Sequence, residues 1–363
     1  MTQDRGLTPT NDGLATAGPR PASDGRSPVL GRPEEEPLVE AGGSQPSTRS
    51  ATVGDYVAIA RFDHATKHVF ILPGIALALL LRGIHETNFV AAVILGGLSA
   101  LFIASANYTI NEYLDREFDK HHPTKSARTA VNVPLDARLV ALEWALFVAL
   151  GLGAALLASG TMFWVALAFA AQGIVYNVRP LRSKDRAFLD VISESINNPL
   201  RLMIGWAMVD PGTLPPSSII LSYWLGGAFL MGAKRLSEFR EIVASHGHAL
   251  LARYRASFYG YSEISLTVSC FVYALLSAFF LGVFLVKYRV EYLIIMPFVT
   301  ALFGKYLALS MRPGSTAQKP EKLFRETGLM VIAVGLGAAF VLATYVDMPA
   351  LNSLTEQQFI TIG

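Results

Sequence analysis

The sequence contains a single cysteine, Cys270, which lies in an apolar run. One cysteine excludes an intramolecular disulfide framework and a metal site built on several thiolates. Charged residues are also scarce, at 16% of 363 residues, against about 25% in an average soluble domain. No basic cluster with interleaved aromatic residues is present, so the sequence gives no indication of a nucleic-acid partner. With 52% hydrophobic residues, the composition predicts a membrane protein.

The beginning of the chain differs from the rest in composition. Residues 1–50 are rich in Gly, Pro, Ser, Thr and charge and show no apolar period, so we expect a disordered cytoplasmic tail. They lack the continuous apolar core and cleavage site of a signal peptide, and we expect the first membrane helix to direct insertion.

Residues 51–67 precede the first long apolar run. Side chains at helical spacing in this stretch are typical of an interfacial amphipathic helix, and a plain linker is the alternative. The side chains at this spacing are Val53, Tyr56, Val57, Ala60 and His64.

Long apolar runs dominate the region 68–346. A run of about 17–25 residues is long enough to cross a bilayer as a helix, and nine such runs are present. The fifth is the least apolar, because it carries several charged and amide side chains. The sequence therefore predicts an all-α polytopic membrane protein, a bundle of nine transmembrane helices. The runs cover approximately 68–84, 88–111, 138–158, 161–178, 188–209, 216–234, 263–286, 290–310 and 327–346.

The distribution of Lys and Arg predicts how the bundle is oriented. These residues are concentrated in the loops after the second, fourth, sixth and eighth runs, whereas the opposite loops hold Arg82, Lys287 and Arg289. Cytoplasmic loops carry an excess of Lys and Arg. We therefore expect the amino terminus in the cytoplasm, a short extracytoplasmic tail over 347–363, and the polar motifs on the cytoplasmic side of a bacterial-type inner membrane.

A ladder of oxygen-bearing side chains ends the second run. Asn107, Asn111, Asp115 and Asp119 are spaced four residues apart, so on a helix they drift by about 40° per step and share one face. Ionisable groups inside a membrane span are costly, so this ladder predicts a functional site. The alternative is that it is only a frayed helix end in water. Carboxylate and amide oxygens suit a hard cation such as Mg²⁺ that is shared with a substrate phosphate.

A second polar stripe runs along the fifth predicted helix. Asp190, Glu194, Asn197 and Arg201 fall within roughly 60° of one another. Asp190 and Glu194 form an acidic pair that we expect to face Asp115 and Asp119, and two such pairs can hold metal ions that bridge a diphosphate. Arg201 lies deeper in the membrane, and we expect it to pair with Glu194 or a neighbouring helix, or to contact a ligand.

These residues resemble two family motifs. Asn111-Glu112-x-x-Asp115-x-x-x-Asp119 is similar to the first motif, Asn-Asp-x-x-Asp-x-x-x-Asp, of the UbiA superfamily of intramembrane prenyltransferases. Asp190-x-x-x-Glu194 resembles its second motif, Asp-x-x-x-Asp. The differences, Glu112 and Glu194, keep a carboxylate. The resemblance implies a UbiA-type bundle, with Asp115, Asp119, Asp190 and Glu194 as catalytic residues and these four with Asn111 as ligands of Mg²⁺.

Within the superfamily, the sequence is most similar to the decaprenyl-phosphate phosphoribosyltransferase branch. The run His122-Pro123-Thr124-Lys125-Ser126-Ala127-Arg128 reproduces that branch's His-Pro-Thr-Lys-x-x-Arg-Pro except for the final residue, Thr129. The segment from Gly232 to Glu238 resembles the branch's Gly-Lys-Arg-x-x-Glu. In contrast, Tyr176-x-x-x-Pro180-x-Arg182-x-Lys184 looks more like the aromatic prenyltransferases.

Three interpretations follow. The resemblance implies Mg²⁺-dependent transfer of 5-phosphoribosyl from phosphoribosyl pyrophosphate to a polyprenyl phosphate, and the alternative is prenylation of an aromatic acceptor by a polyprenyl diphosphate. The third interpretation is a transporter or a lipid-binding membrane protein without chemistry, since buried Asp, Glu and Arg also line ion paths. It predicts inverted repeats, and none is visible. The sequence does not determine an oligomeric state. The candidate substrate-binding residues are Asn107, Lys125, Arg128, Tyr176, Arg182, Lys184, Asn197, Arg201 and Lys234.

Overall fold

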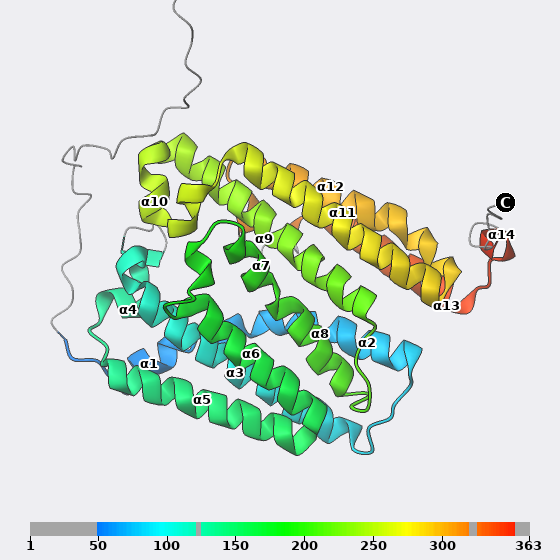
Figure 1. Ribbon diagram of the computed structural model, residues 1–363, viewed down its shortest axis with the longest axis horizontal. Helices are drawn as coiled ribbons and strands as arrows, with labels where there is room; N and C mark the ends of the chain where they lie inside the picture. Colours follow the sequence, from blue (N-terminus) through cyan, green and yellow to red (C-terminus); the bar gives the residue numbers. More distant parts are fainter. Residues whose placement is uncertain (1–48, 121–124, 319–324, 353–363) are drawn as a thin grey trace, which may run out of the picture. The chain divides into compact units, whose positions relative to one another are not determined.

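In the computed structural model, residues 49–120, 125–318 and 325–352 are described, and they contain helices and no strand (Figure 1). The predicted tail over 1–50 falls almost entirely outside these residues, as do His122, Pro123 and Thr124 and most of the predicted tail over 347–363. The helices are α1 Val53–Ile59, η1 Phe62–Ile71, α2 Leu72–Leu81, α3 Phe89–Asp119, η2 Lys125–Ala127, α4 Thr129–Asn132, α5 Ala137–Ala158, α6 Gly160–Asn177, η3 Ser183–Asp185, α7 Leu189–Ser195, α8 Asn197–Ala207, α9 Ser217–His246, η4 His248–Leu250, α10 Leu251–Tyr254, η5 Ala256–Gly260, α11 Glu263–Tyr288, η6 Val290–Ile295, α12 Met296–Ser310, η7 Thr316–Gln318, α13 Thr327–Tyr345 and α14 Pro349–Asn352.

Each predicted apolar run coincides with helical structure, which confirms the all-α membrane fold. Within the described part of the chain, five helical segments are long and apolar enough to cross a membrane: Phe89–Asp119, Ala137–Ala158, Glu263–Tyr288, Val290–Ser310 and Thr327–Tyr345. The fifth predicted run is split into α7 and α8, and α9 carries charged residues in its second half. The total of nine crossings stays a prediction.

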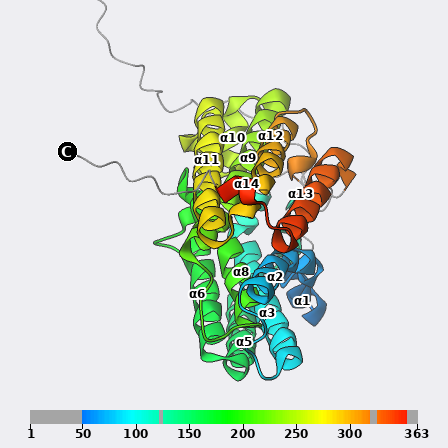
Figure 2. The ribbon, with the colours of Figure 1, turned by 90° about the vertical axis from the view of Figure 1, so that its right-hand side faces the viewer.

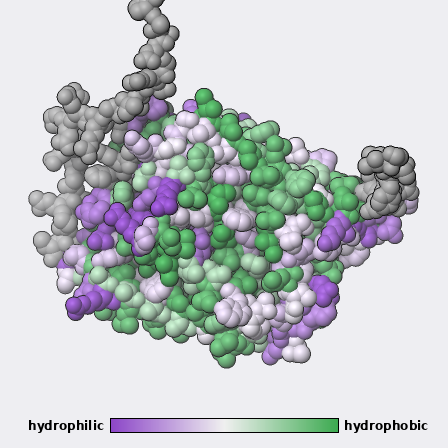
Figure 3. All heavy atoms as spheres, in the orientation of Figure 1, coloured by the Kyte–Doolittle hydropathy of each residue, from purple (hydrophilic) through white to green (hydrophobic). Residues whose placement is uncertain are grey.

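Large apolar side chains face outward along these helices. On α5, Leu139, Leu142, Leu146 and Leu150 are exposed at spacings of three and four residues, and so form one stripe. An exposed apolar stripe of this length is stable against lipid and not against water. Figure 3 shows hydrophobic side chains over the middle of the visible face and hydrophilic ones gathered toward its left and right ends, as a membrane-spanning bundle requires.

Two groups of helices form the bundle. In one, α3 lies along α5, and α6 packs against both; in the other, α9 lies along α11, and α12 packs against both (Figures 1 and 2). The first group is packed around Phe169, Met162 and Ile103, and the second around Phe229, Tyr306 and Cys270. The helices α7 and α8 contact both α6 and α9, so the second polar stripe lies between the two groups.

Glycines bring α2 and α8 into close contact. A Cβ atom at Gly74 would overlap the carbonyl of Leu202, and one at Gly205 would overlap the carbonyl of Ile71. Small residues allow membrane helices to approach closely. This contact holds α8, and with it Arg201, beside η1.

The chain breaks between α7 and α8. α7 ends at Ser195 and α8 begins at Asn197, so Pro199 lies in the first turn of α8. Proline has no N–H to donate to the carbonyl four residues earlier and interrupts a helix at that point. The helix is interrupted at Ile196, within one turn of Pro199.

The segment before the first membrane run is not one continuous helix. α1 ends before Arg61, whose φ of 53° is left-handed, and the 3₁₀ segment η1 follows. Ile59 is buried beside Ala130 and Val140, whereas Val53 and Val57 are exposed. The single amphipathic helix expected over 51–67 is wrong in this respect, because the left-handed residue changes the chain direction. The location of α1 at the membrane surface stays a prediction.

Candidate active site

The last turns of α3 present Asn111 and Asp115 to a lysine from the loop after α6. Lys184 Nζ lies 2.6 Å from Asp115 Oδ1 and donates to Asn111 Oδ1 at 3.1 Å and to Asn177 Oδ1 at 2.7 Å. An ammonium has three hydrogens to donate, so all of them are used. Arg182 Nη2 donates to the same Asp115 oxygen at 2.9 Å. Lys184 and Arg182 thereby connect the end of α3 to the loop that follows α6.

The environment of Lys184 disfavours its charged form. Lys184 lies in η3, outside the membrane helices, and burial lowers its pKa to about 8, although the neighbouring Asp115 acts in the opposite direction. Burial in a medium of low dielectric penalises the ammonium. The charge on Lys184 therefore depends on the carboxylate that it contacts.

Asp119, one turn beyond Asp115, has its own pair of cations. Arg128 Nη1 lies 2.6 Å from Asp119 Oδ2, and Lys125 Nζ lies 3.9 Å from Oδ1. Burial, together with the positive charge of Arg255, lowers the pKa of Lys125 to about 8. We call Asn111, Asp115, Asp119 and their four cations, Arg182, Lys184, Lys125 and Arg128, the α3 cluster.

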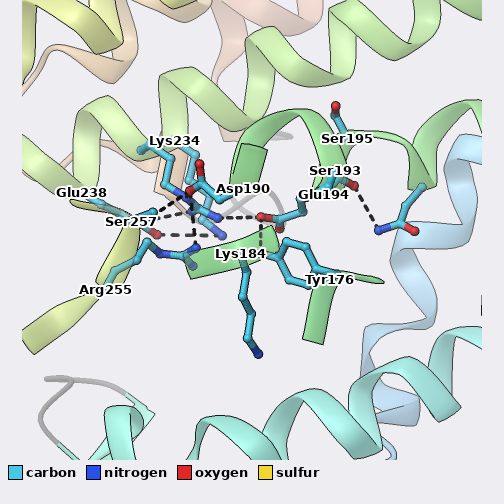
Figure 4. A network of polar contacts seen from close by, with 12 residues as sticks. Tyr176, Lys184, Asp190, Ser193, Glu194, Ser195, Lys234, Glu238, Arg255 and Ser257 are labelled. Atoms are coloured by element: carbon cyan, nitrogen blue, oxygen red, sulfur yellow. Dashed lines mark hydrogen bonds and ion pairs between the residues drawn. The ribbon is translucent and has the colours of Figure 1, made fainter. Parts of the chain in front are cut away.

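The second acidic motif surrounds one arginine of α9. Arg235 donates from Nε to Asp190 Oδ2 at 3.2 Å, from Nη2 to Glu194 Oε2 at 2.5 Å and from Nη1 to Glu238 Oε2 at 3.1 Å. Asp190 has no exposed surface and also accepts from Ser257 and Tyr261. We call these carboxylates and Arg235, together with Lys234 and Arg255, the Arg235 cluster (Figure 4).

Two side chains connect the clusters. The Tyr176 hydroxyl donates to Glu194 Oε2 at 3.0 Å, and Lys184 Nζ lies 5.8 Å from the centre of the Tyr176 ring. Figure 4 shows Lys184 extending away from Tyr176 and the Arg235 cluster. Arg255 acts electrostatically on both Asp115 and Glu194. The two acidic motifs are therefore neighbours, which was the expectation from their spacing.

The α3 cluster has a donor set that suits a hard cation. Its oxygens come from Asn111, Asp115 and Asp119, and such oxygens are the ligands that Mg²⁺ takes when it is shared with a phosphate. Among the described residues, no three carboxylate, imidazole or thiolate side chains gather closely enough to hold an ion by themselves. The residues therefore fit an ion held jointly with a substrate diphosphate, with Glu194, whose side chain is 29% exposed, as a further accessible oxygen.

Asp190 differs from the other predicted metal ligands. Both of its oxygens accept hydrogen bonds, from Arg235 and Ser257 at Oδ2 and from Tyr261 at Oδ1. These contacts favour a role for Asp190 in holding Arg235 in position. Metal ligation by Asp190 stays a prediction that the contacts do not support.

Three predicted substrate-binding residues lie deeper in the bundle. Asn107 Nδ2 donates to the Phe169 carbonyl at 3.1 Å, and a Cβ at Gly173 would overlap its amide, so Asn107 joins α3 to α6. Asn197 Nδ2 donates to the Glu194 carbonyl at 3.0 Å. The expected pairing of Arg201 with Glu194 is wrong, because Glu194 instead pairs with Arg235.

Sequence reasoning missed several members of the Arg235 cluster. Arg255 lies 3.7 Å from Asp190, and Ser257 and Tyr261 come from the same loop. We counted Arg255 among the positive charges of a cytoplasmic loop. The run Tyr254-Arg255-Ala256-Ser257-Phe258 has no periodicity that would have indicated a contact with Asp190.

Fold and site together define a class of protein. A helical membrane bundle in which two acidic motifs are paired with buried cations is typical of a membrane-embedded enzyme. The chain belongs to the UbiA prenyltransferase family, whose model matches residues 69–327. The resemblance to the superfamily is thus confirmed, and the protein is a multi-pass membrane transferase of this family. The more specific branch stays a prediction.

Relatives and solved structures agree with this assignment. A lycopene elongase/hydratase from Haloarcula japonica is 31% identical over 135 residues, which are 37% of this chain and 44% of the relative. A UbiA homologue from Archaeoglobus fulgidus bound to DMAPP and Mg²⁺ matches 80% of this chain and 100% of its own, with a TM-score of 0.59 and 21% identity. A digeranylgeranylglyceryl phosphate synthase matches 80% of this chain and 96% of its own, with a TM-score of 0.54 and 13% identity.

Proposed function

We propose that the protein transfers 5-phosphoribosyl from phosphoribosyl pyrophosphate to a polyprenyl phosphate at the cytoplasmic face of a bacterial-type inner membrane. In this reaction an oxygen of the lipid phosphate attacks C1 of the ribose, and the bond from C1 to the diphosphate oxygen breaks. The diphosphate leaves with the electron pair, and the product is a phosphodiester.

The observation that carries the proposal is the number of cations at the site. The α3 cluster has four cationic side chains, Lys125, Arg128, Arg182 and Lys184, and two carboxylates, Asp115 and Asp119, while a third carboxylate, Asp185, contacts Arg182 from outside the cluster. The donor brings a diphosphate and a 5-phosphate, and the acceptor brings a third anionic group. A prenyl transfer to a neutral aromatic ring requires fewer cations.

Each part of the α3 cluster has a role in this reaction. Asn111, Asp115 and Asp119 would hold Mg²⁺, which when bound screens the charge of the diphosphate. Arg182, with Nε on Asp185 and Nη2 on Asp115, is fixed with its planar fork beside the leaving group. Lys125 and Arg128, which contact Asp119 at the end of α3, would bind the 5-phosphate.

The Arg235 cluster positions the ribose side of the site. Arg235 contacts three carboxylates, and one of them, Glu194, also accepts a hydrogen bond from the Tyr176 hydroxyl. Glu194 is partly exposed and negatively charged, so it stabilises positive charge that develops at C1 as the diphosphate departs.

Prenyl transfer to an acceptor is the second candidate. It is favoured by the family to which the chain belongs and by relatives described as a lycopene elongase/hydratase and as bound to DMAPP or GPP with Mg²⁺. In this reaction the same cations would bind the diphosphate of a polyprenyl diphosphate.

One experiment distinguishes the two. Purified full-length protein is given radiolabelled phosphoribosyl pyrophosphate, a polyprenyl phosphate and Mg²⁺, and a parallel sample receives a labelled polyprenyl diphosphate and an aromatic acid. We expect labelled lipid in the first sample and none when Mg²⁺ is chelated. If the protein forms prenylated aromatic acid and no phosphoribosyl lipid, the first proposal is wrong and the second is favoured.

A further inference from the structure

Arg201 is a buried arginine without a carboxylate partner in the described part of the chain. Its residue surface is 6% exposed, and no acidic side chain of that part lies within 4.0 Å of its guanidinium. Nη1 is 3.4 Å from the Asn197 carbonyl, the ring centre of Phe169 is 5.0 Å from Cζ, and Tyr108 contributes a side-chain hydrogen bond. Nε has no hydrogen-bond partner.

Such an arginine is costly for a membrane bundle. A charge removed from water destabilises the fold unless an opposite charge and hydrogen bonds compensate for it. Within membrane segments, buried arginines pair with carboxylates or carbonyls or mark the path of a ligand. The contacts of Arg201 with a ring, a carbonyl and a tyrosine do not supply an opposite charge, so a bound anion is the missing partner.

Other polar groups around Arg201 point to the same kind of ligand. Lys67 Nζ lies 5.1 Å from the ring centre of Tyr108, the residue that also contacts Arg201. Arg201 and Lys67 both act electrostatically on the imidazole of His68, whose Nδ1 is buried and has no hydrogen-bond partner. Two cations and the unused ring nitrogen of His68 are therefore available to an anion beside Tyr108.

This place is next to the proposed active site but is separate from the α3 cluster. Lys67 acts electrostatically on Glu194, the accessible carboxylate of the Arg235 cluster. Arg201 lies on α8, beyond the break that separates this helix from Asp190 on α7. Arg201 lies over the ring of Phe169, which belongs to the apolar core of the first helix group.

We propose that Arg201 and Lys67, with His68, bind the phosphate of the lipid acceptor, an inference that rests on the proposed function. The depth and the apolar surroundings favour an anion that carries a hydrocarbon chain over one that enters from water. The proximity of Lys67 to Glu194 places the lipid phosphate beside the ribose. The donor phosphates are bound separately, by the α3 cluster.

The test is direct binding, which needs no turnover. Full-length protein in detergent is titrated with farnesyl phosphate, with farnesol, with inorganic phosphate and with phosphoribosyl pyrophosphate plus Mg²⁺. For Arg201→Gln we expect farnesyl phosphate to bind about ten- to hundredfold more weakly, the scale of a lost charge-assisted hydrogen bond. Binding of farnesol and of phosphoribosyl pyrophosphate should not change.

Further variants keep the result interpretable. Arg201→Lys should lose part of the affinity, because it keeps the charge without the planar fork. Lys67→Gln tests the same site if Arg201→Gln does not fold. Arg312→Gln, an exposed arginine, is the matched control and should bind like wild type.

Three outcomes would overturn the inference. The first is that both Arg201→Gln and Lys67→Gln bind farnesyl phosphate as wild type does. The second is that inorganic phosphate binds as tightly as farnesyl phosphate, and the third is that the variants lose affinity only for phosphoribosyl pyrophosphate. If farnesyl phosphate binds through Arg201 but wild type makes no phosphoribosyl lipid, the proposed function fails and the anion site stands. If the lipid product forms and the variants bind normally, the function stands and the site fails.

Discussion

Lys184 Nζ lies 2.6 Å from Asp115 Oδ1 and 2.7 Å from Asn177 Oδ1, so one ammonium joins the end of α3 to the end of α6. The lysine contacts the same α3 oxygens that are proposed to hold Mg²⁺. Its positive charge holds these oxygens together. A Mg²⁺ ion on the same oxygens would compete with the Lys184 ammonium, for which a substrate phosphate would offer new acceptors.

The first prediction concerns Asp115. Asp115→Asn keeps an oxygen for Lys184 and Arg182 but removes the charge, so we expect the protein to fold in detergent and to lose activity by orders of magnitude at every Mg²⁺ concentration. The matched control is Glu117→Gln, because Glu117 forms an exposed pair with Lys120, and exposed pairs contribute little. Turnover of Asp115→Asn close to that of Glu117→Gln would refute the role of the α3 cluster.

The second prediction concerns Arg235. Arg235→Met leaves Asp190, Glu194 and Glu238 without their central cation, and breaking a buried ion pair costs about 3–5 kcal/mol. We expect a large fall in the thermal unfolding temperature in detergent. Lys234→Met, which removes a cation that is 25% exposed and 4.0 Å from Glu238, should lower it much less. Equal unfolding temperatures for the two variants would show that Arg235 does not hold the cluster together.

The third prediction is a pH dependence of donor binding. Burial lowers the pKa of Lys125 to about 8, so its ammonium is charged below this pH and loses its charge as the pH rises above it. We expect the KM for phosphoribosyl pyrophosphate to increase above pH 8 in wild type, by up to about ten- to hundredfold if KM follows binding. Lys125→Arg should remove this increase, because arginine stays protonated. The same increase in Lys125→Arg would assign it to another group.

The fourth prediction concerns orientation. The distribution of Lys and Arg places residue 126 in the cytoplasm and residue 353 outside. In a Cys270→Ala background, single cysteines introduced as Ser126→Cys and Ser353→Cys should react with a membrane-impermeant thiol reagent from opposite sides of sealed vesicles. Reaction from the same side would mean that the number of crossings differs from nine by one.

Local patterns in the sequence were sufficient to predict the helices and the first acidic motif. The four-residue spacing of Asn111, Asp115 and Asp119 held because α3 continues as one helix to Asp119. The break before Pro199 also followed from local chemistry, since a missing N–H acts within one turn. The helix expected over 51–67 failed at Arg61, because the left-handed conformation of a non-glycine residue has no sequence signature.

The sequence by itself determined the class of this protein: long apolar runs require a helical bundle in a membrane, and helical spacing places carboxylates on one face. The tertiary structure decided which cation meets which carboxylate. Glu194 is paired with Arg235 and Asp190 is contacted by Tyr261, residues 41 and 71 positions further along the chain, and Arg201 is left without an acidic partner among the described residues. The reason is physical: a buried charge must be compensated, but helix packing decides which side chains are close enough to do so.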